Sequence, residues 1–111
     1  MNTTKLCFTL AAGLLASTTA FADAPAKAAV CAACHGADGK AVQPMYPNLA
    51  GQYANYLEHA LREYKSGLRK NPIMGGQAAS LSDADIHELA QYFSQQPSPL
   101  YTPSVHGAEK K

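Results

Sequence analysis

Two cysteines and a histidine stand together in the segment Cys31-Ala32-Ala33-Cys34-His35. Thiols at this spacing can add to the two vinyl groups of one porphyrin, and the imidazole that follows can ligate its iron, so C-x-x-C-H is typical of c-type haem attachment. A thioredoxin-like dithiol needs no adjacent histidine and belongs in a βαβ context, whereas no strand-like run adjoins this segment. A zinc site would need further Cys or His ligands at suitable spacing, and the sequence has no second cysteine pair. The motif therefore predicts one covalent haem.

Helices are expected on both sides of this motif. The first starts near Asp23 and Pro25 and carries the chain into Cys31, so that it presents both thiols. The second covers residues 52–65 and ends at Gly67, a residue type that commonly terminates helices. Along it, apolar and aromatic residues recur at helical spacing: Tyr53, Leu57, Ala60, Leu61 and Tyr64.

A third helix is predicted after Ser82, which stands three residues before Asp85 as in a capping box, and it ends before Pro97. Its apolar stripe consists of Ile86, Leu89, Ala90 and Phe93. Two loops are predicted between the helices, over residues 36–51 and 67–80, because their composition resists regular structure. The expected fold class is all-α, with three main helices and two loops around one covalent haem.

The first 22 residues have the order of an export signal: Lys5 in a short basic start, an apolar run over residues 6–16, and the small-residue exit Ala20-Phe21-Ala22. We expect cleavage after Ala22 and removal of Cys7 with the signal. The run of about eleven residues is short of the roughly twenty that span a bilayer, which disfavours a permanent anchor. Residues 23–96 would then form one domain, and residues 97–111 an extended tail, mobile rather than docked.

Charge gives no reason to expect a nucleic acid partner. Removing Lys5 from the nine Lys and Arg residues leaves eight against eight acidic residues, and no sustained basic stripe is present. A domain of this size has little side-chain core, so a haem would supply apolar volume that the chain lacks. An exported chain with a covalent haem suits the bacterial periplasm, which is the expected location.

In the order helix, C-x-x-C-H, loop, helix, methionine loop and closing helix, the chain resembles a class I cytochrome c with a single haem. The resemblance covers nearly all of residues 23–111 and is to one half of the two-haem bacterial periplasmic cytochromes c. The matching segments are residues 31–36 with Asp38-Gly39, residues 46–52, Tyr56-Leu57, Ser66-Gly67, Met74, residues 81–83 and residues 89–93. The resemblance implies the small cytochrome c fold.

The resemblance also implies that His35 and Met74 are the axial ligands of the haem iron, beside the thioethers of Cys31 and Cys34. Imidazole suits iron, and a thioether stabilises the softer ferrous form. Met74 lies between prolines and glycines in a segment that can fold over the haem face. Met45 is the rival ligand, but it follows His35 by only about ten residues, too short a loop to pass round the porphyrin.

Several further residues are candidates for contacts with the haem. The resemblance implies that the carbonyl of Pro47 accepts the Nδ1 proton of His35, the alternative being an ordinary loop proline. Arg69 and Lys70 could meet haem propionates, the acids of a partner, or only solvent. Aromatic and apolar residues that could line the haem, or simply form core, are Tyr46, Tyr53, Tyr56, Leu61 and Phe93.

The remaining histidines are not expected to bind iron. His59 and His87 fall within predicted helices on faces shared with charged residues, where an exposed position is favoured over ligation. His106 lies in the predicted tail.

Three functions are compatible with these residues. The leading one is a periplasmic electron carrier, expected to be monomeric and without a membrane span, whose iron cycles between ferrous and ferric states and reacts with periplasmic or membrane-bound redox proteins. The second is a haem subunit of a dehydrogenase or oxidase complex. The third, an enzyme or gas sensor, would need an open iron position, with Met74 absent or displaced and an acid or base such as His59 at the iron. With both axial positions filled, no catalytic residue is expected.

Overall fold

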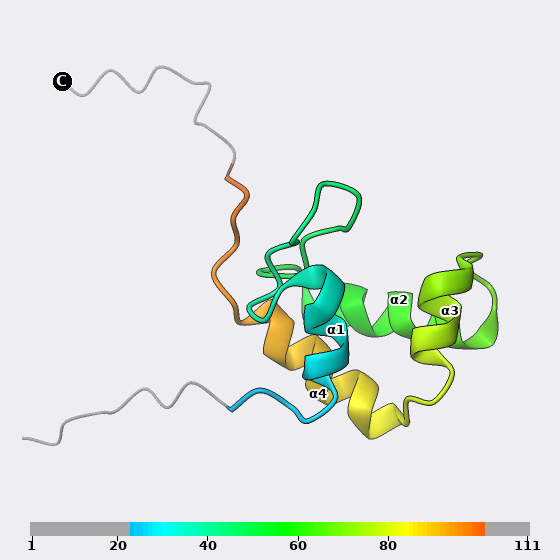
Figure 1. Cartoon of the computed structure of the whole chain (residues 1–111). Coiled ribbons are helices and arrows are strands. Elements are labelled where there is room, and N and C mark those ends of the chain that lie inside the picture. Colours follow the sequence, from blue (N-terminus) through cyan, green and yellow to red (C-terminus); the bar gives the residue numbers. More distant parts are fainter. Residues whose placement is uncertain (1–22, 102–111) are drawn as a thin grey trace, which may run out of the picture.

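The computed structural model describes residues 23–101 and places four α-helices there, with no strand among these residues. They are α1 (Ala28–His35), α2 (Ala54–Ser66), α3 (Pro72–Ala78) and α4 (Asp83–Ser94), as Figure 1 shows. The all-α prediction is confirmed. No helix within residues 23–101 has the length and apolar character that crossing a membrane requires. The predicted signal segment and most of the predicted tail lie outside the described residues.

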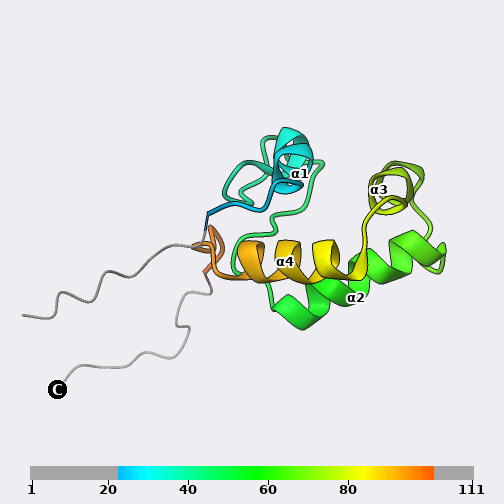
Figure 2. The same cartoon turned by 90° about the horizontal axis from the view of Figure 1, so that it is seen from below.

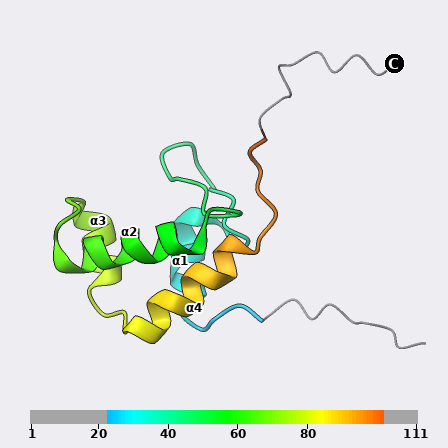
Figure 3. The same ribbon diagram turned by 180° about the vertical axis from the view of Figure 1, so that it is seen from behind.

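The core forms where α2 and α4 pack together. Figure 2 shows this pair side by side, with α1 and α3 both on one side of it. In Figure 3, which views the molecule of Figure 1 from behind, the pair lies in front of α1. The buried core cluster draws on all four helices and consists of Ala28, Leu57, Ala78, Leu81, Ile86, Leu89, Ala90 and Phe93.

The ends of α2 and α4 follow from their sequences. Gly67 adopts a left-handed conformation, with φ of 79°, and its N–H donates to the carbonyl of Tyr64, so α2 ends where predicted. At the start of α4 the Ser82 hydroxyl accepts from the N–H of Asp85 at 3.1 Å, while the Asp85 carboxylate accepts from the N–H of Ser82 at 2.7 Å. This reciprocal pair is the predicted capping box.

Helix α1 begins later than expected. Residues 23–25 have no regular structure, a turn in which the N–H of Ala28 donates to the carbonyl of Pro25 follows, and the helix starts at Ala28. Pro25 therefore shapes the turn before the helix rather than its first turn. A salt bridge of 3.0 Å from the Lys27 ammonium to the Asp85 carboxylate ties this turn to α4.

The second predicted loop contains a helix. Residues 72–78 form α3, because the side chain of Asn71 caps it and Pro72 occupies a first-turn position that needs no donor. Glycines at positions 75 and 76 disfavour a helix interior, but Ala78 is fully buried against the core and holds the far end. The prediction of an irregular segment over residues 67–80 was wrong for its central part.

The first predicted loop, which links α1 to α2, is confirmed as irregular but is well bonded. The carbonyl of Gly39 accepts from the N–H groups of Leu49 and Ala50 at 2.7 and 3.1 Å. Gly39 has φ of 77°, and a Cβ there would lie 2.7 Å from the backbone nitrogen of Ala50, so only glycine fits. The hydroxyl of Tyr92 on α4 donates to the carbonyl of Ala37 at 3.0 Å, which fixes this loop to the core.

Candidate haem site

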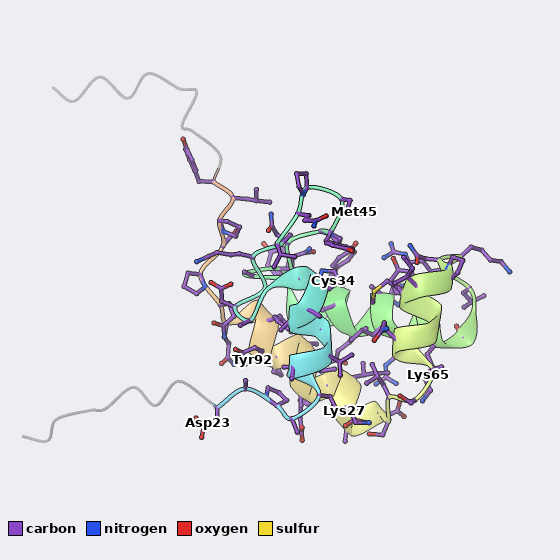
Figure 4. The ribbon with its side chains drawn as sticks, in the orientation of Figure 1. Asp23, Lys27, Cys34, Met45, Lys65 and Tyr92 are labelled. Carbon is purple, nitrogen blue, oxygen red and sulfur yellow. The ribbon has the colours of Figure 1, made fainter. Side chains whose placement is uncertain are left out.

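Helix α1 presents the two thiols of the C-x-x-C-H segment. Cys31 and Cys34 are both free and half-buried, and Cys31 packs against the core cluster. Burial raises the pKa of the Cys31 thiol, because a thiolate there would lose its hydration. Figure 4 labels Cys34 on α1.

His35, the last residue of α1, is buried, with 6 % of its surface exposed. Its Nδ1 lies 2.8 Å from the carbonyl oxygen of Pro47, which is the hydrogen bond that the resemblance implied. A carbonyl can only accept, so Nδ1 carries the proton and Nε2 keeps the lone pair with which imidazole binds metals. The bond therefore fixes both the tautomer and the orientation of the ring.

An apolar cavity opens between the helices, and we call it the inner cavity. It is lined by Cys31 and His35 of α1, Pro47, Leu49 and Gln52 of the first loop, Tyr56, Leu57, Ala60, Leu61 and Tyr64 of α2, Leu89, Ala90 and Phe93 of α4, and Arg69 and Met74. A second depression, the outer hollow, adjoins it. Its lining is Val30, Cys31, Ala33, Cys34, His35, Met45, Tyr46, Pro47, Tyr64, Asn71, Ile73, Met74 and Gln77. The residues that belong to both are Cys31, His35, Pro47, Tyr64 and Met74.

Met74 reaches the cavity from α3. Its backbone N–H and that of Ile73 each donate to the Asn71 carboxamide oxygen at 3.0 Å, so the capped first turn of α3 sets the position of Met74. The residue is half-buried. Met45, the rival ligand, lines only the outer hollow, is 70 % exposed and lies out on the first loop in Figure 4.

The residues that meet here fit a covalent haem. Two thiols lie on one helix, an imidazole with its Nε2 free follows them, and a thioether sulfur lines the same cavity. These are the donors of a c-type haem site with His and Met ligands. The remaining wall is mainly aliphatic and aromatic, which suits the body of a porphyrin. Cys34 lines only the outer hollow, and that hollow brings together all four residues predicted to hold haem.

Most of the predicted lining residues are also in place. Tyr56, Leu61 and Phe93 line the inner cavity, and Tyr46 lines the outer hollow. Tyr53 does neither: it directly precedes α2 in an extended conformation and is 83 % exposed, so the prediction of a lining role was wrong. Sequence reasoning missed Leu49 and Gln52, which come from the irregular loop, where no periodic pattern marks the inward positions.

The other histidines lie away from this cavity. The Nε2 of His59 is 3.2 Å from the Glu63 carboxylate, and the Nδ1 of His87 is 2.7 Å from that of Glu58. Both side chains are mainly exposed, as predicted, and neither lines the inner cavity or the outer hollow. His106 lies outside the described residues.

The two candidate cations, Arg69 and Lys70, lie in different places relative to the inner cavity. Arg69 lines the inner cavity, whereas Lys70 is exposed and does not line it. Lys70 borders only a shallow depression between α2 and α3, together with Asn71 and Pro72. The structure therefore retains Arg69 alone as a residue that can face the haem.

Comparison with known proteins agrees with this geometry. The family model for cytochrome c matches residues 22–97. The chain belongs to the cytochrome c family. This cytochrome c is similar to cytochrome c-554(548) of Halomonas halodenitrificans, with 47 % identity over 63 % of this chain and 88 % of that protein.

Longer relatives match as well. Cytochrome c4 of Pseudomonas aeruginosa is 42 % identical over 86 % of this chain, which spans only 49 % of that relative. The crystal structure of reduced recombinant cytochrome c4 from Pseudomonas stutzeri has a TM-score of 0.57 and 34 % identity, over 60 % of this chain and 38 % of that one. The predicted likeness to about half of a longer cytochrome is confirmed.

Membership of the family supplies the cofactor and the general function. A cytochrome c carries covalent haem c with iron, and the C-x-x-C-H spacing of this chain agrees with that attachment. Its relatives are electron-transfer cytochromes, so the general function predicted from the sequence, electron transfer, is confirmed.

Proposed function

We propose that this chain is a periplasmic electron carrier with one haem, bound covalently by Cys31 and Cys34 and ligated axially by His35 and Met74. The observation that supports this most directly is that His35 and Met74 line the same cavity, with the Nδ1 of His35 already engaged by Pro47. Haem c supplies the one-electron chemistry when bound. With His35 and Met74 as its two protein ligands, the iron would have no coordination site left for a substrate.

The protein's own residues then hold this arrangement in both oxidation states. Pro47 keeps the His35 ring in one orientation and makes it a stronger donor. Asn71 keeps the first turn of α3 formed, and with it Met74. Two ligands held in this way need little rearrangement when the charge of the site changes by one electron, which favours fast exchange with a partner.

A carrier rather than an enzyme is supported by the composition of the cavity wall. Apart from Cys31, His35 and Arg69, the described residues that line the inner cavity have apolar, aromatic or amide side chains. Group-transfer chemistry needs a nucleophile beside a general base, and the candidate pair among these residues is the Cys31 thiol with His35. The proposed haem attachment takes this thiol, together with that of Cys34, so neither would be left to act as a nucleophile.

The alternative function is a haem subunit docked to a dehydrogenase or oxidase. It draws support from three exposed apolar residues on the rim of the outer hollow: Val30, Met45 and Ile73. Small apolar contacts also serve transient electron transfer, so the rim suits both functions. Purification from native periplasm separates them: a carrier elutes alone, and a subunit co-elutes with a large redox enzyme.

Export to the periplasm is part of the proposal. It rests on the signal-like order of residues 1–22, and it implies redox partners in the periplasm or at the membrane that faces it. N-terminal sequencing of the mature protein tests it, with Asp23 expected as the first residue. A mature protein that begins at Met1 and stays in the membrane contradicts the proposal.

Carbon monoxide provides the test of the carrier function itself. We expect the purified ferrous protein to bind it slowly or not at all at neutral pH, since Met74 holds the position that the gas would take, and to pass its electron rapidly to an added redox partner. Fast stoichiometric binding together with peroxide turnover at enzyme-like rates would reject the carrier and establish an open-site enzyme or sensor. Optical spectra in both oxidation states read out the result.

A further inference from the structure

Arg69 differs in charge from everything else around the inner cavity. Among the described residues that line it, Arg69 is the only Lys, Arg, Asp or Glu. A guanidinium stays protonated at any pH of interest, so this wall carries one fixed positive charge. An apolar cavity with a single cation is suited to a ligand that is apolar over most of its surface and anionic at one edge.

Neighbours on α2 hold the guanidinium over this wall. The Cζ atom of Arg69 lies 5.3 Å from the ring centroid of Tyr64 and 5.9 Å from that of Tyr56, and both distances are within the range of cation–π attraction. The N–H of Arg69 also donates to the carbonyl of Glu63 at 3.1 Å, which turns the segment after Gly67 back toward the helix. The side chain is therefore directed along α2 to the cavity instead of into solvent.

The Arg69 guanidinium has N–H donors available for a further hydrogen-bond partner. Its one ion pair is long, with Nε 3.6 Å from a Glu63 carboxylate oxygen. A guanidinium has five N–H donors in a planar fork that matches a carboxylate, so most of its hydrogen-bonding capacity is open to a second anion. The side chain is 38 % exposed, so the guanidinium remains accessible to an anion bound at this wall.

Haem carries two propionate carboxylates as its anionic edge. We propose that Arg69 binds one of these propionates and so acts as a positioning residue that raises the reduction potential of the haem. A positive charge at this edge offsets the negative charge of the propionate and favours the ferrous state, which is the less positive of the two. This inference rests on the proposed function, since it assumes a haem in the inner cavity.

The test measures the midpoint potential of purified haem protein at neutral pH and low salt, where charges are least screened. Arg69→Gln removes the charge, and we expect a shift of about tenfold toward the ferric form, which for a one-electron couple is about 59 mV lower. Arg69→Lys keeps the charge and should recover part of the shift. The matched control is Arg62→Gln, because Arg62 is exposed on α2, pairs with Asp83 and lines neither cavity.

Haem content and the low-spin spectrum are recorded for every variant, so that a change of potential is separated from loss of the site. An unchanged potential in Arg69→Gln with full haem overturns the role of Arg69 and leaves the carrier function standing. An equal fall in Arg62→Gln also overturns it, because the effect would then be general surface charge. Failure of the wild-type protein to show a reversible one-electron couple rejects the proposed function instead.

A second variant covers the case in which Arg69→Gln does not fold. Glu63→Gln removes the acid beside Arg69 and leaves the cation uncompensated, so we expect the potential to rise above the wild-type value. This rise in potential is opposite in sign to the change expected from damage that exposes the haem to water. A potential that stays constant or falls in Glu63→Gln contradicts the proposal.

Discussion

The carboxamide oxygen of Asn71 accepts a hydrogen bond of 3.0 Å from the backbone N–H of Met74. One side chain thus caps α3 and sets the place of the residue that faces the haem cavity from this helix. Because α3 has only seven residues, it has few other bonds with which to keep its first turn.

We predict that Asn71→Ala lowers the free energy of unfolding by about 1 kcal/mol, the usual cost of losing such a cap. Under the proposed ligation it also increases the high-spin fraction of the ferric haem protein, since Met74 is less firmly held. Thermal unfolding and optical spectra measure the two effects. Asn55→Ala is the control, because Asn55 is exposed near the start of α2 and lines neither cavity. Equal spectra for both variants would show that the cap does not support ligation.

Replacement of the two methionines separates the proposed axial ligand from its rival. Met74→Ala should lose the six-coordinate low-spin state and lower the reduction potential while keeping its haem, because attachment depends on the thioethers. Met45→Ala should leave the spectrum unchanged, since Met45 is exposed and lines only the outer hollow. The ferric near-red sulfur-to-iron band reports ligation directly. Its survival in Met74→Ala would move the ligand role to another residue.

Haem attachment can be read from the mass of the denatured protein. After expression with a haem-maturation system we expect the mature chain plus one haem. The double variant Cys31→Ala with Cys34→Ala should lose all haem on acid extraction, because no covalent bond remains. Cys7→Ala is the control and should retain haem, since Cys7 is predicted to leave with the signal segment. A double variant that keeps its haem in denaturant would disprove the proposed attachment.

Stability in acid should depend on the capping box of α4. Hydrogen bonds from Ser82, together with the Lys27 ammonium, lower the pKa of Asp85 to about 2. The folded-state pKa is below the unfolded one, so the stabilisation is complete above the ordinary aspartate pKa of about 4 and is lost as pH falls toward 2. Thermal unfolding at a series of pH values should show the midpoint falling in this window for the wild type and a flatter profile for Asp85→Asn. Glu88→Gln, at an exposed position of α4 outside this bonding, should keep the wild-type slope.

Local signals in the sequence were sufficient for much of the fold and of the site. Gly67 and the pair of Ser82 and Asp85 mark helix ends through their own backbone and side-chain chemistry, so distant parts of the chain did not matter. The spacing of Cys31, Cys34 and His35 likewise determines a haem motif without reference to the rest. Their shared cavity with Met74 was predicted only because the chain resembles a known family.

The features that were missed depend on tertiary contacts or on weak signals. Asn71-Pro72 is a helix start in its own right, but the following glycines obscured it, and only burial of Ala78 against the core completes α3. Tyr53 fits the apolar period of α2, yet its extended backbone at the cap turns the side chain outward. The orientation of Arg69 depends on two tyrosines a turn or more away on α2, which periodicity cannot reveal.

The placement of thiols and thioether on separate helices has a consequence for the unfolded chain. Cys31 and Cys34 lie on α1, whereas Met74 lies on α3, which packs against α2. With the proposed attachment and ligation, the porphyrin becomes a bridge that closes a loop of roughly forty residues. By analogy with a disulfide, closing such a loop removes conformational entropy worth about 4 kcal/mol from the denatured ensemble. The cofactor would then act as a cross-link in a small domain, covalent at the cysteines and coordinate at Met74. Unfolding of the domain would become easier when the sulfur–iron bond breaks.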